Sequence, residues 1–66
     1  MRKGRRKQTM KIHNMPIYAW QYTYIVYRSI DGDAWLYGAF DSVNEASQVA
    51  AEVHGYIEVT KNVETA

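Results

Sequence analysis

The chain has 66 residues, a formal net charge of +1 and no cysteine. A domain of this size buries only about 60% of the surface of its unfolded chain, which leaves little core around which to build a deep catalytic cleft. The lack of cysteine excludes disulfides, thiol chemistry and cysteine-ligated zinc. Its apolar runs are far shorter than the roughly 18 residues that span a bilayer, so we expect a soluble, cytoplasmic protein with no membrane segment.

Charge is distributed unevenly along the chain. Residues 1–11 contain six basic residues and no acidic one, whereas residues 12–66 contain two basic and seven acidic residues. Because residues 1–11 also lack a hydrophobic period, they are predicted to form a disordered basic tail, and residues 12–66 a single domain. Such a tail either is solvated or contacts the phosphates of a nucleic acid. The basic residues expected to make those contacts are Arg2, Lys3, Arg5, Arg6 and Lys7.

The first predicted element is a strand over residues 18–30, which are dense in β-branched and aromatic side chains. Pro16, which lacks a backbone N–H, marks the boundary before it. Asp31 and Gly32 follow, a dipeptide typical of a tight type I′ turn, and residues 35–40 then resume the apolar pattern. These segments predict a β-hairpin.

A helix is predicted next. Ser42 and Glu45 have the spacing of a capping box, in which the two side chains satisfy backbone N–H groups of the first turn. A stripe of valine and alanine recurs at helical spacing over residues 43–53, and Gly55 is expected to cap the C-terminal end.

The last predicted element is a third strand over residues 56–60, where apolar and polar residues alternate, and residues 61–66 are expected to be frayed. The fold class is therefore α+β. We expect a small ββαβ domain with a three-stranded, antiparallel-type sheet and one helix on one face.

The register of the hairpin decides which side chains share a face. A two-residue or a four-residue loop places odd positions of the first strand beside even positions of the second, whereas a three-residue loop would swap this partnership. The helix is expected to cover the face formed by Thr23, Ile25, Tyr27, Leu36, Gly38 and Phe40.

The opposite face has no predicted element left to cover it. We expect this aromatic face to bind a partner protein or a second copy of the chain. Alternatively it is a solvated ladder of cross-strand aromatic pairs on which Arg28 stacks. The residues expected at the interface are Tyr22, Tyr24, Val26, Arg28, Trp35 and Tyr37.

Four acidic residues lie near predicted strand ends. They are expected to form an acidic docking edge for a basic protein that handles nucleic acid, because opposite charge accelerates and orients association. Turn chemistry explains the two that flank Gly32 better than a calcium loop, which needs a later bidentate glutamate. The four residues are Asp31, Asp33, Asp41 and Glu45.

Catalytic chemistry is not indicated. The serines have capping or turn roles, and His54 lies on the predicted last helical turn, where a cation suits the helix dipole. No nucleophile, base and orienting group can be assembled, and no phosphate-binding glycine loop or metal-ligand spacing occurs in the sequence. We therefore predict a protein that is not an enzyme and has no metal or cofactor.

One stretch resembles a known family. Residues 37–42, with Asn44, Ala46 and residues 55–56, resemble half of a sporulation-related peptidoglycan-binding repeat. That family pairs two strand–helix–strand halves and binds glycan strands on its sheet. The resemblance implies the strand-to-helix crossover only, because the second half has no counterpart in this chain.

Three functions compete on this basis. The leading interpretation is a non-catalytic protein-binding module, a homodimer, acting as a small accessory or inhibitor protein of the phage or mobile-element type. The alternative is a nucleic-acid-binding protein, in which strand aromatics stack unpaired bases and the basic tail follows the backbone. The third is glycan binding on the aromatic face.

Overall fold

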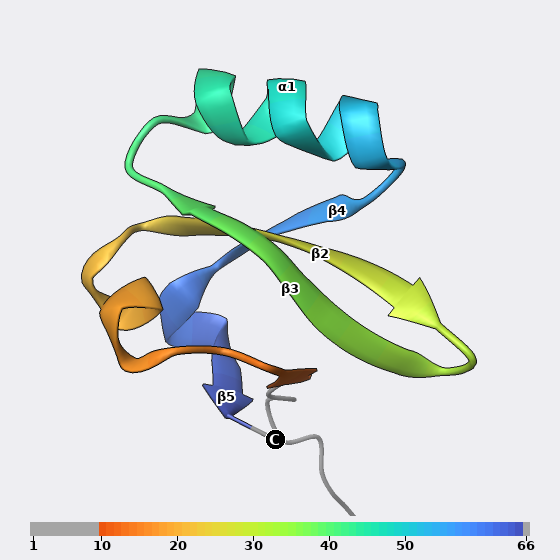
Figure 1. The fold of residues 1–66 in the computed structure, drawn as a ribbon. Coiled ribbons are helices and arrows are strands. Elements are labelled where there is room, and N and C mark those ends of the chain that lie inside the picture. Colours follow the sequence, from red (N-terminus) through yellow and green to blue (C-terminus); the bar gives the residue numbers. More distant parts are fainter. Residues whose placement is uncertain (1–9, 66) are drawn as a thin grey trace, which may run out of the picture.

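The structure, a computed structural model, describes residues 10–65. The basic residues 2–7 therefore lie outside the described residues, while β1 begins at Met10, within the range expected to be a tail. The elements in chain order are β1 (Met10–His13), the 3-10 helix η1 (Ile17–Gln21), β2 (Tyr24–Ile30), β3 (Asp33–Phe40), α1 (Val43–Val53), β4 (Tyr56–Val59), the 3-10 helix η2 (Thr60–Asn62) and β5 (Val63–Thr65) (Figure 1).

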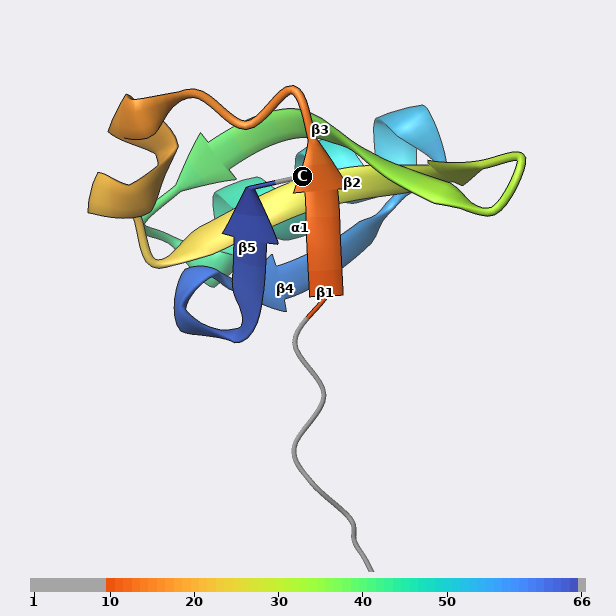
Figure 2. The ribbon, with the colours of Figure 1, turned by 90° about the horizontal axis from the view of Figure 1, so that it is seen from below.

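The strands form one mixed sheet in the order β4-β2-β3-β1-β5. β2 pairs antiparallel with β3 and β4, whereas β1 pairs parallel with β3 and β5. The sheet curls, so that β1 and β5 cross beneath β2 and β4 (Figure 2). The α+β class with one helix is confirmed among the described residues, but the expected three-stranded sheet understates a sheet of five strands.

The predicted turn of the hairpin is confirmed. Ile30 pairs with Asp33, which leaves a two-residue loop. Asp31 and Gly32 have φ angles of 53° and 87°, the two positive values that a type I′ turn requires.

The hairpin pairing shifts by one residue in its middle. Tyr27 pairs with Leu36, whereas Val26 pairs with Gly38, so Tyr37 is the extra residue of a β-bulge. Because successive side chains of a strand point to opposite faces, the extra residue reverses the faces on one side of the bulge.

α1 covers the face that was expected to bind a partner. Val26 is fully buried against Ala46 and Ala50, and Tyr24 and Phe40 pack against this cluster. The prediction that α1 covers the face of Ile25, Tyr27 and Leu36 is therefore wrong, although Phe40 packs beneath α1 as expected. The bulge places the end of β3 on the same face of the sheet as Tyr24. A regular register, which contains no bulge, does not predict this position.

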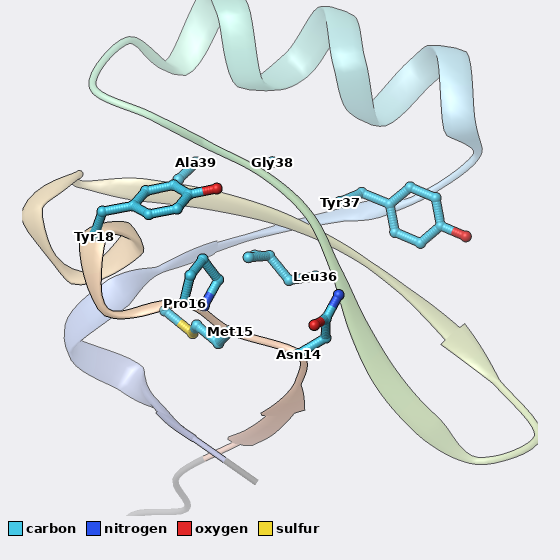
Figure 3. A pocket seen from close by; sticks show the side chains of 8 residues that line it. All are labelled: Asn14, Met15, Pro16, Tyr18, Leu36, Tyr37, Gly38 and Ala39. Carbon is cyan, nitrogen blue, oxygen red and sulfur yellow. The ribbon is translucent and has the colours of Figure 1, made fainter.

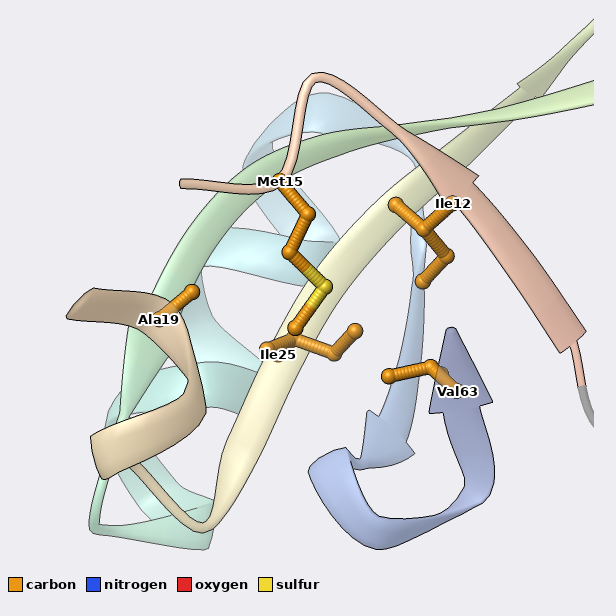
Figure 4. Packing of buried hydrophobic residues seen from close by; sticks show 5 residues of the cluster. All are labelled: Ile12, Met15, Ala19, Ile25 and Val63. Atoms are coloured by element: carbon orange, nitrogen blue, oxygen red, sulfur yellow. The ribbon is translucent and has the colours of Figure 1, made fainter. Parts of the chain in front are cut away.

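The second face of the sheet is covered by the chain itself. Figure 4 shows the cluster that fills it, with side chains from β1, the segment before η1, η1, β2 and β5. The expectation of an uncovered face is wrong. The segment before Pro16, which was expected to be a boundary, and residues 61–66, which were expected to be frayed, contribute side chains that cover this face. The buried residues of this cluster are Ile12, Met15, Ala19, Ile25 and Val63.

The start of the expected first strand is a 3-10 helix. The N–H of Ala19 donates to the carbonyl of Pro16 at 3.0 Å, and the N–H of Tyr22 donates to the carbonyl of Ala19 at 3.2 Å. The buried Ala19 methyl fixes this turn against the core. Aromatic content alone predicts a strand from Tyr18, but β2 begins only at Tyr24.

The Ser42 half of the predicted capping box is confirmed. The Ser42 Oγ accepts hydrogen bonds from the N–H groups of Asn44 and Glu45, at 3.2 and 3.4 Å. At the other end the left-handed residue is His54, with a φ of 57°, and not Gly55. No helix in the described part of the chain is long and apolar enough to cross a membrane.

Candidate binding surface

The six residues expected to form one partner-binding face lie in three places. Val26 and Tyr24 contact the chain's own helix α1. Tyr22 ends η1 and Tyr37 forms the bulge, and both are exposed. The two remaining residues, Arg28 and Trp35, pair with each other nearer the hairpin turn.

The four acidic residues do not form one edge. Asp31 and Asp33 lie at the hairpin turn, whereas Asp41 and Glu45 lie where β3 ends and α1 begins. β3 has eight residues, so the two pairs are separated by roughly 25 Å at about 3.3 Å per residue. Asp41 has a structural contact, because its Oδ1 accepts a hydrogen bond from the N–H of Thr23 at 3.3 Å.

The most exposed apolar side chains belong to η1, which the sequence reasoning missed. Ile17 is 86% exposed and Tyr18 is 61% exposed. Ala19, which lies between Tyr18 and Trp20 in the sequence, is fully buried. We call Ile17, Tyr18 and Trp20 the η1 knob. One sequence signal could have found it: residues 12–27 contain no lysine, arginine, aspartate or glutamate.

An open groove of about 560 Å³ adjoins the η1 knob (Figure 3). β1 pairs only with Ala34 and Trp35 of β3, so the rest of β3 has no strand on that side. Residues 14–18 form the opposite wall of the groove that is left there. None of its lining residues carries a charge, and we call it the uncharged groove. It is lined by Asn14, Met15, Pro16, Tyr18, Leu36, Tyr37, Gly38 and Ala39.

A second cluster lies across β1, β3 and β2 near the hairpin turn. The rings of His13 and Trp35 stack with their centroids 4.7 Å apart, and the His13 Nε2 lies 3.6 Å from the Asp33 Oδ1. Arg28 pairs with Trp35 from the opposite side. We call His13, Trp35 and Arg28 the Trp35 row, and Trp35 within it is 39% exposed.

A second open groove, of about 730 Å³, lies beside the Trp35 row, and Lys11, Tyr27 and Tyr56 contribute to its lining. The rings of Tyr27 and Tyr56 are 5.5 Å apart. Burial raises the pKa of Tyr27, and the negative charge of Glu58 and the neighbouring Tyr56 raise it further. The Tyr27 phenol therefore stays protonated at neutral pH and serves as a hydrogen-bonding and packing group.

The described residues bring no three histidine, aspartate or glutamate side chains together as a metal site. His13 and Asp33 join β1 to the hairpin, and Ser29 and Lys11 line the same groove as this pair. The arrangement thus offers surfaces for packing and stacking.

Comparison of the chain with protein-family models, curated proteins and solved structures finds no match. Two surfaces of the described residues are candidates for binding: the η1 knob with the uncharged groove, and the Trp35 row.

Proposed function

We propose that this chain is a non-catalytic protein-binding module that docks through the η1 knob and the uncharged groove. The observation that carries the proposal is the position of Ile17, whose side chain is 86% exposed in a turn that is anchored by the buried Ala19. Exposed apolar patches of this kind are typical of interaction sites, and tyrosine and tryptophan are enriched among the residues that dominate binding energy.

The surroundings of this surface support the same role. The acidic residues lie at the two ends of β3 and on α1, β4 and β5, outside the uncharged groove. An apolar centre with charged surroundings is the usual anatomy of a protein interface. We propose that the acidic surroundings favour a basic partner, as in a small accessory or inhibitor protein.

The test is a site-specific photo-crosslinker in the cell that naturally produces the chain. Tyr18 and Tyr56 are matched positions, because both are tyrosines with similar exposure, 61% and 58%. We expect a crosslinker at position 18 to form discrete protein adducts, and one at position 56 to form none of them. Adducts that are equal at both positions, or absent from both, would contradict the proposal.

A second candidate function is the binding of single-stranded nucleic acid. The Trp35 row favours it, because an exposed indole with Arg28 beside it is suited to base stacking and phosphate contact. Lys11 precedes this row in the chain, and six basic residues lie within residues 1–11. Asp31 and Asp33 at the same end of the hairpin oppose a polyanion.

Fluorescence can decide this second candidate. In a Trp20→Phe variant Trp35 is the remaining tryptophan, so its emission reports contact with an oligonucleotide. Quenching by single-stranded DNA that weakens steeply with salt, and that is lost in a chain starting at Met10, would support nucleic-acid binding. An unchanged emission would remove this candidate and leave the protein-binding proposal standing.

A further inference from the structure

We infer that the occupant of the uncharged groove is an extended, basic peptide segment of the partner, which pairs as a further strand with the edge of β3 that β1 leaves free. This inference rests on the proposed protein-binding function and names the kind of partner and its mode of binding. Four observations carry it, which concern the pairing of β3, the direction of its backbone groups, the floor of the groove and the surrounding charge.

β3 lies at the centre of the sheet, yet most of it has a strand on one side only. It is third in the order β4-β2-β3-β1-β5, but β1 ends at His13, and the next residue, Asn14, leaves the extended conformation with a left-handed φ of 61°. Among the described residues, the ladder partners of residues 36–40 all belong to β2, and no residue of β3 is buried. β3 also carries neither lysine nor proline, with which proteins commonly guard a free edge.

The backbone of Ala39 directs its hydrogen-bonding groups to the side without a strand. The carbonyl of Thr23 accepts a hydrogen bond from the N–H of Thr60, which follows β4, at 3.0 Å, so Thr23 faces away from β3. Successive residues of a strand point these groups to alternate sides, so Ile25 also faces away from β3. Ala39 is the ladder partner of Ile25, and its N–H and C=O therefore point away from β2. Such groups at a sheet edge are a template for another strand.

The floor of the groove suits the apolar side chains of an added strand. Met15 belongs to the core cluster, and Leu36 and Ala39 pack against it. Residues 14–18 lie opposite these β3 residues along the groove (Figure 3). In strand addition the backbone hydrogen bonds supply affinity, and alternate side chains enter pockets and supply specificity. We therefore expect the bound segment to carry apolar residues at alternate positions.

The charge around the groove selects a basic segment. Asp33 begins β3 and Asp41 follows its last residue, so an acidic side chain lies at each end of the strand. Residues 12–66 contain seven acidic residues and two basic ones, whereas the lining of the groove carries no charge. Basic side chains at the ends of the segment are therefore attracted, and an acidic segment is repelled. In a pair of identical copies the same acidic residues would face one another, which disfavours a second copy as the occupant.

The first experiment pans a phage-displayed library of random linear heptapeptides against the full chain and measures the selected peptides by fluorescence anisotropy. We expect apolar residues at alternate positions and lysine or arginine at the ends. Methylation of the peptide's backbone nitrogens, one at a time, should weaken binding about tenfold or more at every second position, because alternate N–H groups of an added strand face β3. Equal effects at all positions would overturn the added strand. A library that yields no binder, or only acidic ones, would overturn the inference.

Ala39→Pro tests the same contact from the side of the protein. It removes the N–H that faces the groove and removes no hydrogen bond between β3 and β2. We expect the affinity for the selected peptide to fall about tenfold or more, with the circular dichroism of the wild type. Ala39→Ser, which keeps the N–H, is the matched control and should bind like the wild type. Binding that survives in folded Ala39→Pro would overturn the role of this edge, and if that variant does not fold, the methylation series decides alone.

The outcomes separate this inference from the function on which it rests. Adducts at position 18 that form in the otherwise unaltered chain and persist in folded Ala39→Pro would overturn strand addition and retain the binding module. Adducts that are absent from both chains would remove both. A wild type that sediments as a dimer, while Ala39→Pro is monomeric, would show that two β3 edges pair with each other and would overturn the basic partner.

Discussion

Ile17 and Ala19 lie two residues apart in η1, and their side chains meet opposite environments. The 3-10 turn has three residues per turn, so its small residue points into the core while its large neighbours point outward. Folding of the single chain gains nothing from an isoleucine at position 17. The proposed binding function depends on this exposure.

We predict that Ile17→Asp changes the free energy of unfolding of the monomer by no more than about 0.5 kcal/mol, because the side chain is exposed. Urea denaturation at a concentration where the chain is monomeric measures this. A loss of several kcal/mol would show that Ile17 has a packing role within its own chain.

Two residues at the C-terminal end of α1, His54 and Gly55, can be tested by substitution. His54 adopts a left-handed φ of 57°, which costs a residue with a side chain about 1 kcal/mol. His54→Gly should therefore raise the free energy of unfolding by about 0.5–1 kcal/mol. Gly55→Ala should lower it, because a Cβ at Gly55 would lie 2.6 Å from the backbone oxygen of Tyr27. Thermal melts of the two variants measure both signs, and equal effects at the two positions would contradict the roles given to His54 and Gly55.

Ionisation of Tyr27 makes the free energy of unfolding depend on pH in the alkaline range. Folding raises its pKa above the ordinary value of 10.0, chiefly through burial. Its contribution is therefore fully present below pH 10.0 and is lost as the pH rises through the higher pKa of the folded state. We predict that Tyr27→Phe flattens the decline of the free energy of unfolding above pH 10.0. Tyr18→Phe, a change at an exposed phenol, is the control and should keep the wild-type decline.

At the scale of the elements, the features that the sequence predicted are those set by neighbouring residues. The Ser42 cap and the Asp31-Gly32 turn depend on contacts within a few positions, and the strand predicted over residues 56–60 is observed over residues 56–59. β1 and β5 have no such local signal. They are strands because β1 pairs with both β3 and β5, and a single sequence does not display that pairing.

The bulge at Tyr37 decides which side of β3 faces α1. Deletion of Tyr37 would leave Tyr27 paired with Leu36 and Val26 paired with Gly38 in one regular register, so Phe40 should stay in the cluster beneath α1. We predict that the deletion changes the free energy of unfolding by less than about 1 kcal/mol, because no apolar side chain leaves the cluster. Urea denaturation measures this change. A loss of several kcal/mol would show that the extra residue itself holds the end of β3 in place.

At the scale of the whole molecule, β1 and β5, the first and last strands of the described residues, complete the core. Ile12 and Val63 are buried together with Ile25, and η2 leads the chain from β4 to β5. The candidate surface depends on the same closure, because residues 14–18 wall the uncharged groove only where the chain leaves β1 for η1. Sequence reasoning anticipated an aromatic interface, and of the residues that it named Tyr37 lines the uncharged groove. It could not place the groove, since a groove between distant segments exists only in the folded molecule.

We predict that a chain starting at Met10 folds like the full chain, whereas a chain starting at Met15 does not. The second truncation removes β1 and with it the fully buried Ile12, whose loss alone is expected to cost about 2–5 kcal/mol. Total stabilities of small domains are of that order. Near-ultraviolet circular dichroism of the two truncated chains is the measurement, and a native spectrum for the shorter chain would contradict the role given to β1.

The parallel pairing of β1 with β5 also bears on how the molecule is made. Met10 pairs with Val63, so during synthesis β1 leaves the ribosome long before its neighbour exists. Such distant pairing slows folding, because the intervening loop must close before the contact is gained. The nascent chain would form its hairpin and α1 early and keep Ile12 and Ile25 accessible to chaperones until β5 emerges.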